Sequence, residues 1–261
     1  MKKIAVCYKW VLSDADIRVN EKTSELDLSR CKPQVNEYDL NGLQAGVKLK
    51  EEAGATELVG LTCGAAVEAS VRDALSRGPD AVYYLEDPVM AQADSSTTSK
   101  VLAGMIKAVG DVDVVICSEG SSDEYAQQTG PRLAALLGYA SVSCVSGISV
   151  QNGALELERK MEEGFEVVRA MPPLVITVTP DVGDAPIPSV KQILGAKKKP
   201  ANALRLADMN LSAETISPLL KTVSILAPKT SRKALCLNSE GVSMEQAVTA
   251  LVKHLNADGL L

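Results

Sequence analysis

The residues best suited to chemistry in this chain lie between Ser118 and Thr129, in a polar stretch of small and acidic side chains. The apolar run Val112–Cys117 before it is typical of a buried strand, and Ala126–Leu137 after it predicts a helix that ends at Gly138. A loop of small residues that enters a helix offers backbone N–H groups and a positive dipole end to an anion. The sequence therefore predicts a phosphate or pyrophosphate site here, with a solvated turn as the alternative.

Strands and helices alternate in the sequence up to residue 138. Lys3–Tyr8 and Leu58–Cys63 are further short apolar runs, and Asn36 is a good N-cap for a helix with Leu40, Leu43, Val47 and Leu49 on one face. This alternation predicts an α/β fold with a doubly wound, mostly parallel sheet covered on both faces. Such sheets bind ligands beyond the carboxyl ends of their strands, so the loops after these three strands are expected to meet.

A strand pair with an unusual order of residues follows. Ala154–Met161 and Phe165–Ala170 alternate apolar and polar side chains around a turn at Glu163-Gly164, and Leu174–Val178 is predicted to be a buried strand. The order of charged, apolar and proline residues resembles the signature of the electron-transferring flavoprotein β-subunit, except that Leu157 replaces a smaller or β-branched residue. The matching positions are Arg159, Glu162, Glu163, Glu166, Val168, Pro173, Val175, Ile176 and Thr177.

Other segments resemble the same family, especially its bacterial Fix or carnitine-type branch. Ile4–Lys9 is similar to the family's first strand, Asn36-Glu37-Tyr38-Asp39 to its Asn-Pro-Tyr-Asp, and Ala126-Gln127 with Gly130-Pro131 to its nucleotide loop. Asn36 and Asp94 have helix capping as an alternative role. The cofactor-binding residues that the resemblance implies are Cys7, Lys9, Asn36, Tyr38, Asp39, Cys63, Asp94, Ser118, Gly120, Ser121, Ser122, Asp123, Tyr125, Ala126, Gln127, Gln128 and Thr129.

Within the loop, the N–H groups from Gly120 to Gln128 and nearby hydroxyls are expected to hold phosphates, and Asp123 to accept from a ribose or ribityl hydroxyl. Glu119 stands where many family members have lysine, so it is expected to point away or to contact a ribose hydroxyl. Gly64, after Cys63, is expected to let the backbone approach the ligand.

The resemblance implies a β-subunit that forms an obligate heterodimer with an α-subunit and carries electrons between an acyl-CoA or related dehydrogenase or reductase and other redox partners. The main FAD would be shared with the α-subunit. The nucleotide bound by this chain itself is expected to be either a second FAD, which is favoured, or AMP. With FAD, the protein would oxidise NADH and bifurcate its electrons, and ferredoxin or flavodoxin would be one acceptor. The alternatives are an AMP-containing carrier, an adenine-nucleotide enzyme of related fold such as an ATP pyrophosphatase, and a non-redox interaction module.

Asp181–Lys199 resembles the family's recognition loop, in which Ile187-Pro188 would anchor a partner dehydrogenase. Five basic residues stand between Ala185 and Ala207 without an acidic one, in a chain of net charge −6. They are either a solvated charge run or a surface that steers an acidic partner, with Lys191 in the partner-binding set. The five are Lys191, Lys197, Lys198, Lys199 and Arg205.

Composition limits the remaining possibilities. The chain has 261 residues, 46% of them hydrophobic, which predicts an α/β domain over residues 1–200 and a C-terminal arm and helix over 201–261 that contact the α-subunit. The acidic balance argues against nucleic acid, and the sequence offers neither a signal peptide nor a membrane span. Six cysteines without CxxC spacing predict reduced thiols in the cytoplasm and no metal centre.

The C-terminal part of the chain is expected to contain three elements. They are an extended arm over 209–230, a short strand at Arg232–Leu237 and a helix at Met244–Leu255 that carries the single histidine, His254.

Overall fold

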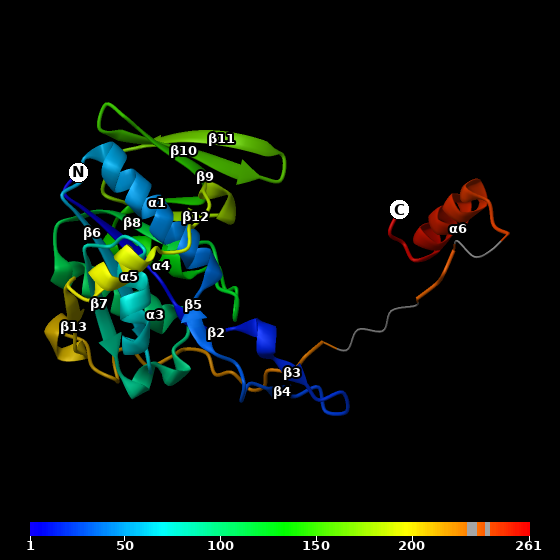
Figure 1. Cartoon of the computed structure of the whole chain (residues 1–261), viewed down its shortest axis with the longest axis horizontal. Coiled ribbons are helices and arrows are strands. Elements are labelled where there is room, and N and C mark those ends of the chain that lie inside the picture. Colours follow the sequence, from blue (N-terminus) through cyan, green and yellow to red (C-terminus); the bar gives the residue numbers. More distant parts are fainter. Residues whose placement is uncertain (229–233, 238–240) are drawn as a thin grey trace. The chain divides into compact units, whose positions relative to one another are not determined.

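The computed structural model describes residues 1–228, 234–237 and 241–261, which fall into two compact units (Figure 1). The first unit comprises Met1–Arg18 and Leu26–Ile225, and the second comprises Val19–Glu25 and Leu226–Leu261. The first unit contains the sheet and all the loops predicted to bind a nucleotide. Each unit is described separately.

A nine-stranded sheet forms the centre of the first unit, in the order β11-β10-β9-β12-β8-β1-β6-β7-β13. Seven neighbouring strands, from β9 to β13, run parallel, and β10 pairs antiparallel with both β9 and β11. The fold is therefore the predicted α/β, doubly wound, mostly parallel arrangement. The strands are β1 (Lys3–Cys7), β6 (Glu57–Gly64), β7 (Ala81–Glu86), β8 (Val112–Ser118), β9 (Ala140–Gln151), β10 (Ala154–Met161), β11 (Gly164–Ala170), β12 (Leu174–Val178) and β13 (Ala201–Ala203).

Helices cover both faces of this sheet (Figure 1). On one face α1 and α2 bury Leu43, Leu49 and Leu75, and on the other α3 and α4 bury Met105 and Leu133. Burying aliphatic side chains on both faces explains why β1, β8 and β12 are continuous apolar runs. The helices are α1 (Glu37–Ala53), α2 (Val71–Ser76), α3 (Ser95–Val109), α4 (Thr129–Leu137) and α5 (Val190–Ala196), with short turns η2 (Glu68–Ser70), η3 (Pro88–Gln92), η4 (Pro180–Val182) and η5 (Leu206–Met209).

Helix α1 packs unusually close to the sheet because it carries glycine on its inner face. A Cβ at Gly46 would lie 2.6 Å from a methyl group of Val6 on β1. The close approach brings the first turn of α1 next to the carboxyl end of β1. There β2 (Trp10–Leu12) pairs antiparallel with β5 (Pro33–Val35), so the residue that follows β5, Asn36, is fixed beside the end of β1.

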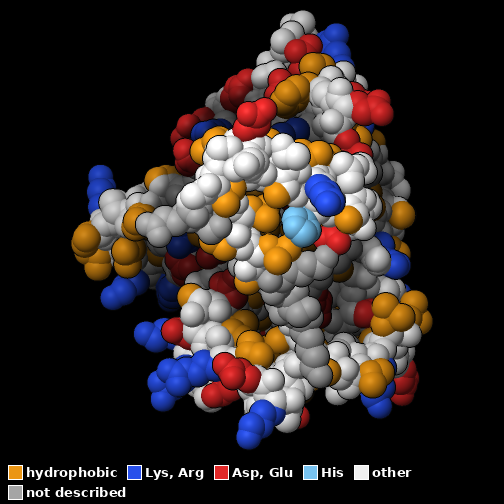
Figure 2. Space-filling view, turned by 90° about the vertical axis from the view of Figure 1, so that its right-hand side faces the viewer, with side chains coloured by type: hydrophobic (Ala, Val, Ile, Leu, Met, Phe, Trp, Pro, Cys, Tyr) orange, Lys and Arg blue, Asp and Glu red, His pale blue; other side chains and the backbone are white. Residues whose placement is uncertain are grey.

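The boundary between the units contains two short strands, β3 (Arg18–Val19) and β4 (Leu26–Asp27), and the turn η1 (Asp14–Asp16). In the second unit, α6 (Met244–Ala257) begins with a capping box of Ser243 and Gln246 and confirms the predicted helix. Its apolar side chains are exposed, Met244 at 80% and Val248 at 49%. Figure 2 shows hydrophobic side chains next to the histidine, with a basic and an acidic side chain also beside it.

Two sequence expectations differ from the structure. The helix predicted from Ala126 begins at Thr129, because Tyr125 and Gln127 have positive φ values of 46° and 56°, which a right-handed helix excludes. The strand expected at Arg232–Leu237 begins outside the described residues, and its described part, 234–237, is not a strand. The recognition segment also contains α5, which the sequence analysis did not expect.

Candidate functional site

The carboxyl ends of β1, β6 and β8 border a cleft of about 580 Å³. The segment after β1, the turn after β6, the long loop after β8 and the first turns of α1 and α3 supply its walls. This is the sheet edge at which parallel α/β folds bind ligands. Of the predicted cofactor-binding residues, those that line the cleft are Cys7, Lys9, Asn36, Asp39, Cys63, Ser118, Gly120, Ser121, Ala126, Gln127, Gln128 and Thr129.

Asn36 joins two walls of the cleft. It is fully buried, and its amide donates from Nδ2 to the carbonyl of Gly120 at 3.2 Å while its Oδ1 accepts from the N–H of Ser122 at 3.0 Å. Its side chain makes no capping bond to α1, although it stands at the N-cap position. The capping role considered from the sequence is therefore wrong, and the side chain instead fixes the loop after β8.

The loop between β8 and α4 presents unused backbone donors. Gln127 is left-handed and Gln128, with φ −113° and ψ −23°, is right-handed, an alternation that turns consecutive N–H groups into one concavity suited to anions. The N–H groups of Ala126, Gln127 and Gln128, which precede α4, have no protein acceptor among the described residues. We refer to residues 126–128 as the nest.

Lys9 supplies the positive charge at this edge. Its ammonium group lies 2.8 Å from a carboxylate oxygen of Asp123 and 3.4 Å from Glu124, while the Ser121 hydroxyl donates to Asp123 at 2.6 Å. Burial acts to raise the pKa of Asp123, but the hydrogen bonds from Lys9 and Ser121 outweigh it and leave that pKa below its ordinary value. Asp123 therefore stays ionised and organises the loop through contacts within the protein.

Asp39, in the first turn of α1, is buried directly beneath Lys9. Its carboxylate accepts the backbone N–H of Lys9 at 2.7 Å. Burial raises the pKa of Asp39 to about 6, and the bond from Lys9 only partly opposes this. A buried carboxylate with a pKa near neutrality is unfavourable for the fold and marks candidate functional sites.

Thiols form part of the cleft floor. Cys7, Cys63 and Cys117 come from the neighbouring strands β1, β6 and β8. Hydrogen bonding to Cys117 and burial raise the pKa of Cys7 well above its ordinary value, and burial raises the pKa of Cys63 to about 12. Cys7 and Cys63 therefore remain neutral thiols and give their part of the floor an apolar character.

Five predicted residues do not line the cleft: Tyr38, Asp94, Ser122, Asp123 and Tyr125. The ring of Tyr125 lies 5.6 Å from that of Tyr38 and close over Gly120, and its hydroxyl donates to Glu119 at 3.0 Å. Glu119 is therefore engaged by a tyrosine of its own loop. Tyr38 and Tyr125 brace the loop from outside the cleft.

Asp94 has the capping role considered from the sequence. One carboxylate oxygen accepts the N–H of Thr97 at 2.8 Å in the first turn of α3, and the other accepts the N–H groups of Leu219 and Leu220. Burial acts to raise the pKa of Asp94, but these backbone donors keep that pKa low. The residue thus attaches the start of the C-terminal arm to α3.

Sequence reasoning missed two contributors to the cleft. Glu86, at the end of β7, accepts the N–H groups of Val67 and Glu68 at 2.8 Å each and so shapes the turn after β6. That turn needs Gly64 because a Cβ there would lie 2.6 Å from Val67, a different reason from the ligand approach expected. The other contributor is Trp10, the single tryptophan, which lines the cleft. Its rarity in a chain with 3% aromatic residues was the available signal.

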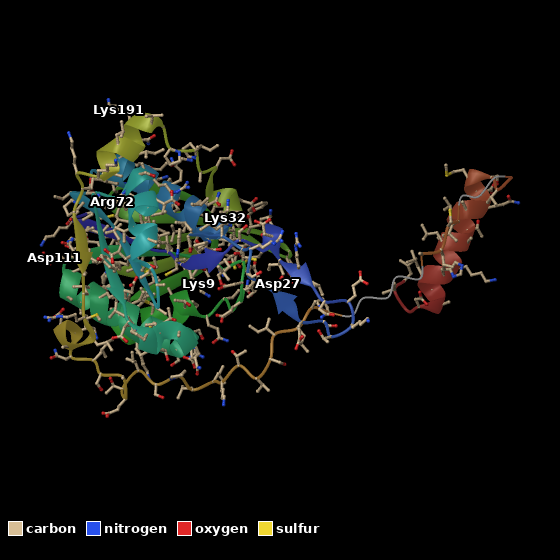
Figure 3. The ribbon with its side chains drawn as sticks, turned by 60° about the horizontal axis from the view of Figure 1, so that its bottom comes forward. Lys9, Asp27, Lys32, Arg72, Asp111 and Lys191 are labelled. Atoms are coloured by element: carbon tan, nitrogen blue, oxygen red, sulfur yellow. The ribbon has the colours of Figure 1, made fainter. Side chains whose placement is uncertain are left out.

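The recognition segment lies away from the cleft, and Figure 3 shows Lys191 on α5 well separated from Lys9. Four apolar side chains are exposed there, Ile187 at 93% and Val190 at 73% with Ile193 and Leu194 next to them. We call these four residues the docking ridge. Its base is fixed, since Asn41 on α1 donates to the carbonyl of Gly183 at 2.7 Å.

The predicted basic run divides into two parts. Lys199 donates to the carbonyls of Leu75, Gly78 and Pro79 at the end of α2, and Arg205 pairs with Asp208 at 3.1 Å, so these two charges are used inside the chain. Burial lowers the pKa of Lys199. In the described part of the chain, Lys191, Lys197 and Lys198 make no ion pair. Fewer basic side chains are therefore left to steer an acidic partner than the sequence suggested.

Comparison with protein families places the chain in a known group. A family model described as the electron transfer flavoprotein domain matches residues 27–209. The chain belongs to the electron transfer flavoprotein family. The match extends from Asp27, the last residue of β4, through the nest, the hairpin and the docking ridge to η5. Electron transfer flavoproteins bind flavin, so a nucleotide cleft at this sheet edge agrees with the family.

Among the described residues, no helix has the length and apolar character needed to cross a bilayer. The same residues include no group of three or more His, Cys, Asp or Glu side chains placed to hold a metal ion.

Proposed function

We propose that this chain is the β-subunit of a heterodimeric electron transfer flavoprotein and that its cleft holds an adenine nucleotide. The observation that carries the proposal is the nest: unused N–H groups beside Lys9, at the carboxyl edge of a parallel sheet. Such donors suit phosphate oxygens. Family membership supplies the redox setting, since electron transfer flavoproteins work with flavin.

The residues present fit this group. The nest and the Thr129 hydroxyl would hold the phosphates, and Lys9 would balance their charge. The Cys63–Val67 turn, Met90 and Leu102 offer a largely apolar wall for an adenine ring. A flavin bound here would supply the capacity to accept a hydride or single electrons. The chain itself contributes binding, orientation and exclusion of water.

We favour FAD over AMP in this cleft. The match of Ala126-Gln127 and Gly130-Pro131 to the family's nucleotide loop supports FAD, and the cleft extends past the nest to Trp10 and Leu12. An FAD site would let the heterodimer oxidise NADH and divide the electrons between two acceptors, one of them a ferredoxin or flavodoxin. With AMP the protein would be a carrier that passes electrons from a dehydrogenase without bifurcation.

The docking ridge supports a protein partner at a second surface. Exposed Ile187 and its apolar neighbours are flanked by Lys191, Lys197 and Lys198, a combination that fits an apolar recess with an acidic rim. A flavin dehydrogenase or reductase such as an acyl-CoA dehydrogenase is the proposed partner. The C-terminal arm and α6 are proposed to contact the α-subunit, and the cytoplasm is the proposed compartment.

The test is purification of the tagged chain from its native cells, followed by release of bound nucleotides in denaturant. The proposal expects a yellow heterodimer that releases about two flavins without stoichiometric AMP, and a flavin that NADH reduces directly. One flavin and one AMP without reduction by NADH would establish the AMP-containing carrier instead. A colourless monomer that hydrolyses ATP would refute the flavoprotein function.

A further inference from the structure

Trp10 occupies a constrained position at the cleft. It starts β2, pairs with Val35 on β5, and lies next to Lys9, whose carbonyl accepts the N–H of Asn36 at 2.9 Å. Its side chain is half-buried against the core cluster on the α1 face, yet it lines the cleft. The ring is thus held by the protein on one side and borders the ligand space on the other.

The cleft has apolar lining on both faces of the sheet. Met90 and Leu102 belong to the core cluster on the α3 face, whereas Trp10 packs against the cluster on the α1 face. The loop from Gly120 to the nest lies between these ends, because Asn36 ties it to α1 and it then leads into α4 on the opposite face. A ligand with its phosphates at the nest can therefore place one ring at each end.

We propose that Trp10 is the stacking platform for the second ring system of a dinucleotide and so determines specificity for FAD over AMP. A mononucleotide fills one apolar end and the nest, whereas the isoalloxazine ring of FAD reaches Trp10. Stacking between an aromatic side chain and a planar heterocycle is favourable, and a half-buried, strand-held ring loses little freedom when it stacks. This inference rests on the proposed nucleotide function of the cleft.

The experiment uses the full 261-residue chain freed of nucleotide, with FAD and AMP as separate probes. Equilibrium binding is measured for the wild type, Trp10→Ala and Trp10→Phe. Phe165→Ala is the matched control, since Phe165 is 67% exposed on β11 and does not line the cleft. Because the chain contains one tryptophan, its fluorescence reports on Trp10 alone.

We expect Trp10→Ala to weaken FAD binding about tenfold or more and AMP binding less than about twofold, whereas Trp10→Phe restores most of the FAD affinity. FAD should quench the tryptophan emission of the wild type far more than AMP does. The unchanged AMP affinity of Trp10→Ala serves as its folding control.

Equal weakening of FAD and AMP would place the adenine ring on Trp10 and overturn the inference, and so would unchanged binding of both. A wild type that binds AMP but not FAD would also overturn it and leave the AMP-containing carrier intact. A wild type that binds neither nucleotide would instead refute the proposed function of the cleft.

Discussion

The cleft is lined by loops at strand ends and by the first turns of helices, whereas the docking ridge consists of Ile187 and three side chains of α5. In the cleft, polar groups distant in sequence bond to each other, as Asn36 does with Gly120 and Ser122. In the ridge, α5 is held to the body by Arg72, which donates to the carbonyl of buried Ala196 at 2.9 Å, yet the ridge side chains themselves are exposed, Ile187 at 93%. The difference indicates that the cleft is preorganised for a small ligand, while the exposed apolar side chains of the ridge suit an interface with another protein.

The largest expected effect is on the link between the cleft walls. Asn36→Ala removes the hydrogen bonds to the Gly120 carbonyl and the Ser122 N–H, each worth about 0.5–1.5 kcal/mol, and with them the link that fixes the loop, so nucleotide retention should fall sharply. Asn41→Ala is the matched control, because the same residue type on the same helix bonds to Gly183 below the ridge. Equilibrium dialysis of both variants measures the difference. Equal retention by the two variants would contradict the division between cleft and ridge.

A second prediction concerns the buried carboxylate of the cleft. Burial raises the pKa of Asp39 from 3.8 to about 6, so the folded state holds this proton more tightly than the unfolded state. That contribution to stability is complete below pH 3.8 and is lost as the pH rises through about 6, a change on the order of 3 kcal/mol. Asp39→Asn should therefore gain stability relative to the wild type between about pH 4 and 7.

Urea unfolding of the nucleotide-free proteins across this range measures the change. Parallel pH profiles for the wild type and Asp39→Asn would show that the carboxylate is not buried as described.

Substitutions in the ridge should affect binding of the partner enzyme and leave nucleotide binding unchanged. Ile187→Ala removes an apolar side chain whose burial in a partner is worth roughly 1.5–3 kcal/mol, so electron transfer to the dehydrogenase should weaken while bound nucleotide is unchanged. Val167→Ala, at a side chain 69% exposed on β11, is the control for loss of surface area. Stopped-flow transfer rates against partner concentration give the affinity. Loss of nucleotide together with transfer would make Ile187 part of the nucleotide site.

The smallest effect is expected at Asp123. Its carboxylate binds Lys9, Ser121 and the N–H of Glu124, but its side chain is 37% exposed, so Asp123→Ala should weaken nucleotide retention by about 1 kcal/mol. Asp181→Ala, which removes a comparably exposed carboxylate from its pair with Lys160, should leave retention unchanged. Full retention in Asp123→Ala would contradict the role of Asp123 in organising the loop for nucleotide binding.

Periodicity and family resemblance were sufficient for the fold and for the loops that meet at the sheet edge. The buried runs at β1, β8 and β12 have one stable arrangement, a sheet covered on both faces. What single residues do there depended on tertiary contacts that spacing does not encode. The side chain of Asn36 was a candidate helix cap, but it forms hydrogen bonds with a loop more than 80 residues away. Lys199 belonged to a predicted surface charge run, but its ammonium group donates to the carbonyl of Leu75 near the end of α2.

The late start of α4 had the same origin. Residues 126–128 have ordinary helix-forming side chains, but Tyr125 and Gln127 have left-handed backbone in a loop whose contacts include the Tyr38–Tyr125 ring pair and the Asn36–Gly120 hydrogen bond. The departure from local preference created the nest. The sequence pattern therefore predicted the loop that offers N–H groups to an anion, but not the backbone conformation of residues 126–128.

Hydrogen–deuterium exchange of the heterodimer tests the separation of cleft and ridge most directly. Removal of nucleotide should raise exchange in residues 120–128 and leave residues 187–194 unchanged, whereas addition of the partner dehydrogenase should protect 187–194 and leave 120–128 unchanged. Protection of the ridge by nucleotide, or unchanged exchange of the nest when nucleotide is removed, would contradict the assignment of the cleft to a nucleotide and of the ridge to a protein partner.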